Sequence, residues 1–212
     1  MKTPLTYQMT RYDCGPATLT NALRYLLARE ESDPELLKAF YERTLDDYGD
    51  DGSLGKKGTS HQAMRNVAAF VNAYAAAHRT PLRASVAHGA AASLLPGSDV
   101  YRLLEDAPEG GAAVVARIWH GDSGHYVLLT GVADGRILAF DPWLEASDDP
   151  KKVADGTLIR EVDDQPLRAN RSVDPAVFNQ DVMANYALKS SANADPDDPE
   201  GGELVILERT DR

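Results

Sequence analysis

The spacing of hydrophobic residues changes about halfway along the chain. Up to about residue 110 the apolar positions recur every three or four residues, which is the pattern of helices that pack one face on a core. Helices are predicted to begin at Cys14, at Pro34, near Thr59 and near Ser98. One short strand, at 83–88, is predicted among them.

From residue 112 onward the apolar runs take the form of β-strands. Strands are predicted at 112–119, 125–133, 136–141, 158–162, 186–189 and 203–209, with a short helix or turn at Asp174-Pro175. Helices followed by an antiparallel sheet make an α+β fold. We expect a single domain over residues 1–212, with a mainly helical lobe over 1–110 and a mainly β lobe over 111–212.

Composition and charge exclude several classes of function. The formal net charge of −11 argues against nucleic acid or an anionic membrane as a main partner. No segment approaches the ~20 apolar residues that span a bilayer, and the N-terminus lacks the apolar run of a signal peptide. No membrane partner and a cytoplasmic location are therefore expected. A lone cysteine and scattered histidines give no metal-ligand spacing, so neither a metal nor a cofactor is expected.

Two acidic stretches, 46–58 and 193–203, are predicted to be exposed loops. The acids of the first miss the alternating spacing of a calcium-binding EF-hand loop. We interpret it as a solvated loop beside a cleft. The sequence assigns no role to either loop, and it leaves the oligomeric state open.

The chemistry of the chain is concentrated around Cys14, its only cysteine. This residue is predicted to lie at the start of a helix, where free N–H groups and the helix dipole favour a thiolate. Such a position can lower a cysteine pKa from ~8.5 to roughly 3.5–7.5. Gln8, six residues upstream, carries an amide that can donate a hydrogen bond beside the sulfur. Because a lone cysteine is most often a buried hydrophobe, a nucleophile also needs a base and an orienting group.

His125 and Asp141 supply that pair if the hairpin between their strands has the right register. A three-residue loop at 133–135, with its glycine in the left-handed conformation, sets Val132 opposite Arg136. Asp141 then lies diagonal to His125 on one face of the sheet, within side-chain reach. A two-residue loop would instead turn Asp141 to the other face. The position of the glycine favours the three-residue loop.

A second histidine, His120, competes with His125 for the role of base. It is predicted to lie in the turn between two strands, and it has no aspartate paired across a strand. His125 is therefore the predicted base and Asp141 its orienter, which together with Cys14 gives the nucleophile–base–orienter arrangement of acyl transfer.

Taken in chain order, three short motifs resemble the peptidase C39-like branch of the papain-like cysteine peptidases. They are Gln8 followed by Cys14-Gly15-Pro16, then Gly124-His125, and then Phe140-Asp141-Pro142. The resemblance covers residues 8 to about 142 and implies a papain-like α+β fold, with an active site between the helical lobe and the sheet. It also implies that Cys14 is the nucleophile, that His125 is the general base and then acid, and that Asp141 orients the imidazole. Gln8 and the backbone N–H of Cys14 would form the oxyanion hole.

These roles predict a hydrolase that cleaves a peptide or amide bond through a thioester. The same residues would serve an acyl or peptidyl transferase, in which an amine or thiol replaces water. A papain-like scaffold that binds a peptide without cleaving it is a further alternative. Family members fused to export transporters cleave leader peptides after paired glycines, but no transporter segment is expected here, so that substrate is not carried over.

Overall fold

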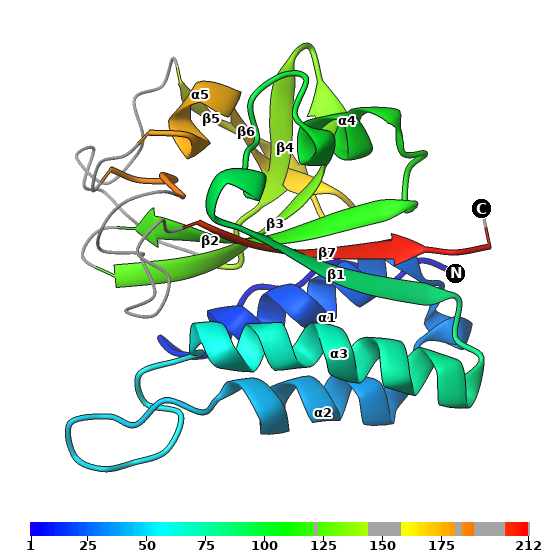
Figure 1. The fold of residues 1–212 in the computed structure, drawn as a ribbon, viewed down its shortest axis with the longest axis vertical. Coiled ribbons are helices and arrows are strands. Elements are labelled where there is room, and N and C mark those ends of the chain that lie inside the picture. The colour runs from blue at the N-terminus through cyan, green and yellow to red at the C-terminus, as the bar shows by residue number, and fades with distance from the viewer. Residues whose placement is uncertain (121–122, 144–157, 181–183, 189–201, 212) are drawn as a thin grey trace.

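A seven-stranded sheet forms the centre of the computed structural model, which describes residues 1–120, 123–143, 158–180, 184–188 and 202–211 (Figure 1). The strands are β1 (Leu82–His88), β2 (Ala112–His120), β3 (Ser123–Ala133), β4 (Arg136–Phe140), β5 (Ile159–Gln165), β6 (Ala169–Val173) and β7 (Glu203–Arg209). Their order in the sheet is β1-β7-β2-β3-β4-β6-β5, and all paired neighbours are antiparallel.

Helices cover both faces of this sheet. One face carries α1 (Cys14–Leu26), α2 (Pro34–Thr44) and α3 (His61–His78), and the other carries α4 (Asp99–Asp106) and α5 (Pro175–Phe178) (Figure 1). Two short 3₁₀ helices, η1 (Arg29–Glu31) and η2 (Gly89–Ala91), complete the described elements. The predicted α+β class, with an N-terminal helical layer packed on an antiparallel sheet, is confirmed.

The starts of the helices follow from side chains that satisfy free backbone N–H groups. The carboxylate of Asp33 accepts from the N–H of Glu35 at the start of α2, and Pro34 occupies the first turn. At the start of α3 the cap is Ser60, which accepts from the N–H of Ala63, one residue after the predicted Thr59. The sequence signals therefore placed these helix starts to within one or two residues.

Two parts of the second half differ from the sequence prediction. Strand β6 was not predicted, because its sequence Ala169-Asn-Arg-Ser-Val173 has too few apolar residues to stand out. The predicted strand at 186–189 is wrong for 186–188, which form no strand; the backbone of Tyr186 and Ala187 bonds to Trp119. Residue 189 and most of the acidic stretch 193–203 lie outside the described residues.

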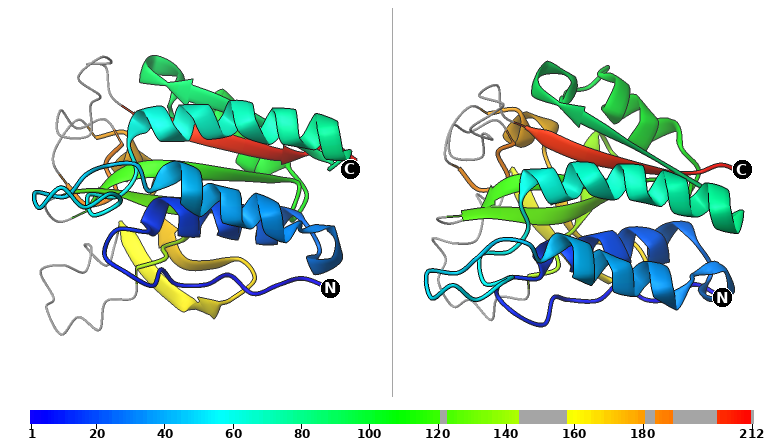
Figure 2. Two further views of the ribbon diagram at one scale, coloured as in Figure 1. Left: turned by 90° about the horizontal axis from the view of Figure 1, so that it is seen from below. Right: turned by 60° about the horizontal axis from the view of Figure 1, so that its bottom comes forward.

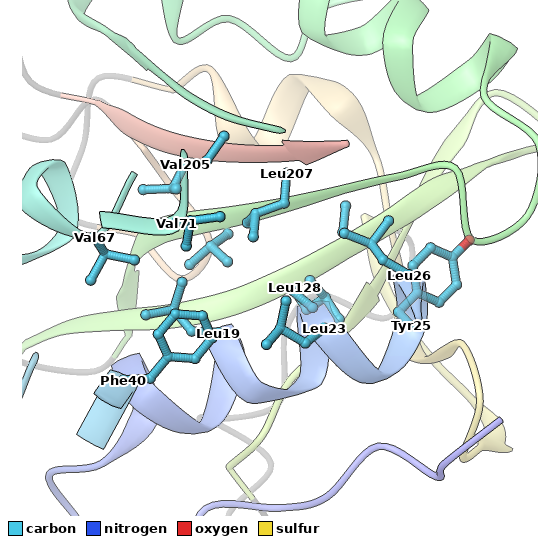
Figure 3. Packing of buried hydrophobic residues seen from close by; sticks show 14 of the residues in the cluster. Leu19, Leu23, Tyr25, Leu26, Phe40, Val67, Val71, Leu128, Val205 and Leu207 are labelled. Atoms are coloured by element: carbon cyan, nitrogen blue, oxygen red, sulfur yellow. The ribbon is translucent and has the colours of Figure 1, made fainter. Parts of the chain in front are cut away.

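The helices on the first face lie along the sheet (Figure 2), and a continuous apolar layer of buried side chains joins them to it. Fully buried leucines of α1 meet Phe40 of α2, valines of α3, and side chains of β3 and β7. Figure 3 labels Leu19, Leu23, Leu26, Phe40, Val67, Val71, Leu128, Val205 and Leu207 in this layer. A second apolar cluster lies on the other face of the sheet, beneath α4 and α5.

Two buried hydrogen bonds attach α1 to β3. The hydroxyl of Thr18 donates to the carbonyl of Tyr126 at 3.0 Å, and the hydroxyl of Tyr25 donates to the carbonyl of Thr130 at 2.7 Å. The two donors are seven residues apart, so they lie on one face of the helix about two turns apart. They hold α1 along β3, and this sets the position of Cys14 at the beginning of the helix.

The turn of the β3–β4 hairpin differs from the prediction. Ala133 pairs directly with Arg136, so the loop has two residues, and the three-residue loop predicted at 133–135 is wrong. Asp134 and Gly135 have φ values of 52° and 72°, as the commonest two-residue hairpin turn requires. Without a further irregularity, this turn would put Asp141 on the face of the sheet opposite His125.

A β-bulge in β3 restores the register that the site needs. The pairing shifts between Leu129 and Gly131, so that one extra residue, Thr130, is accommodated in β3. Beyond the bulge, Leu128 pairs with Phe140. One residue further along both strands, Asp141 lies opposite Val127, which is on the same face of the sheet as His125. The short turn and the bulge therefore compensate, and Asp141 reaches the predicted face for a reason that the sequence pattern did not reveal.

The bulge offers a test of how firmly α1 is attached to the sheet. Tyr25→Phe removes the hydroxyl and leaves the carbonyl of Thr130 buried without that donor, so we expect the free energy of unfolding to fall by about 1–2 kcal/mol. Urea denaturation checks this value, with the exposed Tyr48→Phe as the matched control. An unchanged unfolding midpoint for Tyr25→Phe would show that this hydrogen bond does not stabilise the fold.

Candidate active site

Cys14 lies at the first residue of α1 with 8% of its surface exposed. The side chain of His125 and the backbone N–H groups of Tyr126 and Gly15 are the groups around its sulfur that lower the pKa of the thiol. A Cβ atom on Gly15 would come 2.2 Å from the hydroxyl of Thr59, so only glycine lets the start of α1 pack this closely on the neighbouring loop. The sulfur is therefore at a helix N-terminus, as predicted.

His125 and Asp141 are buried together next to this sulfur. The distance between Nε2 of His125 and Oδ1 of Asp141 is 2.8 Å. Because Asp141 occupies Nε2, the ring nitrogen left for the sulfur of Cys14 is Nδ1. The carboxylate of Asp141 thus fixes the orientation of the imidazole, with Nε2 toward Asp141 and Nδ1 toward Cys14.

Asp141 is itself held by groups from several segments. Its Oδ1 also accepts from the N–H of Trp143 at 2.9 Å, and its Oδ2 accepts from the hydroxyl of Tyr186 at 2.7 Å. Asn170 of β6 bonds the backbone of Asp141 twice: it accepts from the N–H at 2.8 Å and donates to the carbonyl at 2.8 Å. Backbone and carboxylate are therefore both fixed.

These contacts change the protonation of all three groups. Burial by itself raises the pKa of the Cys14 thiol, but the hydrogen bond and charge of His125, with the two N–H donors, outweigh it and lower the pKa. Burial by itself lowers the pKa of His125, but the carboxylate of Asp141 and the sulfur raise it to about 10. For Asp141, His125 and the donors overcome burial and hold the pKa below its usual range. At neutral pH the arrangement favours a thiolate, an imidazolium and a carboxylate.

The side chain that precedes α1 does not cap the N-terminus of the helix. Asp13 precedes α1, yet within the described part of the chain its carboxylate makes no cap bond to the helix. It accepts instead from the N–H groups of Met9 and Thr10, at 3.1 and 2.7 Å, which closes the loop on itself. The carboxylate of Asp13 therefore leaves the first N–H groups of α1 without a side-chain cap.

Gln8 is brought close to the site by its backbone, and its side chain points into its own loop. Its N–H donates to the carbonyl of Pro142 at 2.9 Å, directly after Asp141. Its Nε2 donates to the carbonyl of Thr10 at 2.7 Å. Its Oε1 is buried with no hydrogen-bond partner among the described residues. Among the four predicted site residues, Cys14, His125 and Asp141 lie in contact, and Gln8 lies beside them.

Asn170 and Tyr186 were not predicted as site residues, because they bond Asp141 from segments that carry no recognisable motif. Asn170 is a polar residue in a strand that the hydrophobic pattern did not reveal, and Tyr186 lies in a segment that was predicted to be a strand. The ring of His120 lies 5.3 Å from that of His125, and the histidine ring that Asp141 bonds is that of His125.

The described residues contain no group of three or more His, Cys, Asp or Glu side chains arranged to hold a metal ion. None of the helices in the described ranges has the combined length and apolar character needed to cross a bilayer.

Comparison with protein families supports a cysteine peptidase as the class of this protein, at the level of the family. The model of the Peptidase_C39 like family matches residues 1–161 of the 212, and the chain belongs to that family. Among solved structures, the chain is similar to a double glycine motif protease from an AMS/PCAT transporter, crystallised in complex with the leader peptide. The two share 13% sequence identity with a TM-score of 0.44, and the alignment covers 99% of this chain and 93% of that chain. A search of curated proteins finds no match.

Proposed function

We propose that this protein is a cysteine hydrolase that cleaves a peptide or amide bond, with Cys14 as nucleophile, His125 as general base and acid, and Asp141 as orienter. The proposal rests chiefly on one observation: a buried 2.8 Å hydrogen bond joins Asp141 to the ring of His125, which acts electrostatically on the sulfur of Cys14 at a helix N-terminus. Membership of the Peptidase_C39 like family supports it.

The reaction follows from the protonation states of the site. The Cys14 thiolate attacks the carbonyl carbon of the substrate, and the carbon–oxygen π electrons move to the oxygen to form a tetrahedral oxyanion. The imidazolium of His125 gives its proton to the leaving nitrogen, the carbon–nitrogen bond breaks, and a thioester remains on Cys14. His125, now neutral, takes a proton from water, whose oxygen attacks the thioester. The carbon–sulfur bond then breaks with its electrons returning to the sulfur, the acid product leaves, and the thiolate–imidazolium pair is restored.

The oxyanion needs donors, and the loop before α1 supplies candidates. The backbone N–H of Cys14 is the first, because it lies at the free end of the helix. Gln8 is the second, and it has to turn for this role because its Nε2 now donates to Thr10 and its unpaired atom is an acceptor. An amide carries two hydrogens, so a turned Gln8 can keep one bond and offer another.

The pH dependence of Cys14 alkylation tests the proposal without a known substrate. Since the pKa of Cys14 is lowered, its reaction with iodoacetamide should rise with pH at values well below the ~8.5 of an ordinary thiol and then level off. The reacting sulfur is identified by mass spectrometry of the labelled peptide. Reaction that begins only above about pH 8 would overturn the proposal, because no thiolate would be present for catalysis near neutrality.

A peptide library then separates hydrolysis from transfer. Products formed in the presence of an added amine or thiol are identified by mass spectrometry. Products that end in a free carboxylate establish a hydrolase, whereas adducts of the added nucleophile establish a transferase. A folded protein that is labelled at Cys14 but binds peptides without turnover would establish a binding module.

A further inference from the structure

Tyr186 makes a buried hydrogen bond to the carboxylate of Asp141 that no family motif explains. Its hydroxyl lies 2.7 Å from Oδ2 of Asp141, and both residues are buried, with 4% and 3% of their surfaces exposed. Tyr186 lies beyond residues 1–161, to which the family model matches. The contact therefore comes from a part of the chain outside the matched region.

The backbone around Tyr186 is held in a conformation that aims this hydroxyl. Tyr186 has a φ of 70°, in the left-handed region that residues with a side chain rarely adopt. Its N–H donates to the carbonyl of Trp119 at 2.8 Å, and the N–H of Trp119 donates to the carbonyl of Ala187 at 2.9 Å. Trp119 follows Ile118, which pairs with His125 across β2 and β3. The same pair of strands therefore positions both His125 and Tyr186.

The direction of the hydrogen bond follows from the neighbouring groups. A carboxylate only accepts, so the hydroxyl of Tyr186 has to donate to Asp141. The guanidinium of Arg171, which can only donate, also acts on this hydroxyl and by itself lowers the pKa of Tyr186. Burial, with the charge of Asp141, raises the pKa of Tyr186 well above its usual value, so the hydroxyl keeps its proton.

We propose that Tyr186 is a positioning residue of this site, which locks the carboxylate of Asp141 so that Oδ1 stays directed at Nε2 of His125. This inference rests on the proposed function. Oδ1 is taken by His125 and the N–H of Trp143, and Oδ2 is taken by Tyr186. With both oxygens engaged, rotation of the carboxylate has to break at least one of these bonds. Without Tyr186, Oδ2 is a buried acceptor that has lost its donor, and the carboxylate turns or takes up a proton.

The consequence is a change in the acid–base behaviour of the neighbouring pair. Among the described residues, the ionisable groups that act on Asp141 and Tyr186 are His125 of β3 and Arg171 of β6. Cys14 of α1 acts on His125, and Arg171 is paired with Glu161 of β5 at 3.4 Å. A carboxylate that is turned or protonated stabilises the imidazolium less. The imidazolium in turn stabilises the Cys14 thiolate less, so the pKa of Cys14 moves upward.

Tyr186→Phe tests this inference, since it keeps the ring and its edge contact with Phe178 and removes only the hydroxyl. We expect the midpoint of the pH profile of Cys14 alkylation to rise by about one pH unit, which lowers the rate about tenfold at any pH below both midpoints. A folded protein is verified by circular dichroism. A structural role alone would change the thermal midpoint and leave the pH profile in place.

The matched control is Tyr74→Phe, which removes a tyrosine–aspartate hydrogen bond of the same type, to Asp33, between α3 and α2. Tyr74 lies thirteen residues along α3 from His61, at the end far from the site, so we expect its alkylation profile to match the unmodified protein. An unchanged or downward-shifted midpoint in Tyr186→Phe overturns the inference while leaving the proposed function intact. A midpoint near pH 8.5 in the unmodified protein overturns the proposed function itself.

Discussion

Cys14→Ala is expected to reduce turnover by on the order of 10⁵-fold, because removal of the nucleophile leaves only binding and oxyanion stabilisation. Any substrate found in the peptide library gives the measurement, as the ratio of kcat/KM for the two proteins. The alanine is small enough for this buried position, so the thermal midpoint should change little.

Two comparisons make this expectation specific to the sulfur. Cys14→Ser replaces the sulfur with a hydroxyl oxygen, which has the pKa of an alcohol. This variant should therefore lose nearly as much activity as Cys14→Ala. Both variants should also lose labelling by a peptide aldehyde. Retention of activity in a folded Cys14→Ala would show that the reaction does not pass through this residue.

His125→Ala is expected to reduce kcat/KM by a similar order of magnitude, about 10⁵-fold, through two effects. The leaving nitrogen loses its proton donor, and Cys14 loses the partner that lowers its pKa while the burial that raises it remains. Alkylation of Cys14 should therefore move toward the pH range of a buried thiol. Kinetic measurement and the alkylation profile check the two effects separately.

The matched control for the base is His120→Ala, since the ring of His120 lies 5.3 Å from that of His125. It leaves the Asp141–His125 pair in place, so most of the activity should remain. Because His125→Ala also leaves the buried Asp141 without its main partner, His125→Gln, which keeps a donor, serves as the variant of choice if alanine unfolds the protein. Equal losses of kcat/KM in His120→Ala and His125→Ala would contradict the assignment of His125 as the base.

The hairpin before Asp141 shows how a correct placement arose from an incorrect local prediction. Gly135 does adopt a left-handed conformation, but Asp134 adopts one as well, which shortens the loop to two residues. The bulge at Thr130 then adds the residue that the loop lacks. Its carbonyl and hydroxyl are satisfied by Tyr25 and by the carbonyl of Arg168, which belong to other segments. A bulge that depends on distant partners has no signal in its own strand.

The pattern of apolar residues and caps was enough to predict the α+β class, the helix that begins at Cys14, and most of the strands. These features depend on local spacing and on backbone groups within a few residues, so the order of residues alone carries them. The motifs around Gln8, Cys14, His125 and Asp141 were likewise legible, because each is short.

Only the tertiary structure decided how those motifs meet. The bulge sets which face Asp141 occupies, Thr18 and Tyr25 set where α1 lies on β3, and Tyr186 engages the carboxylate from a segment with no motif. Each of these contacts joins residues between 45 and 108 positions apart in the chain. Their energies depend on burial and on partners brought together by packing, and no window of the sequence contains both halves of such an interaction.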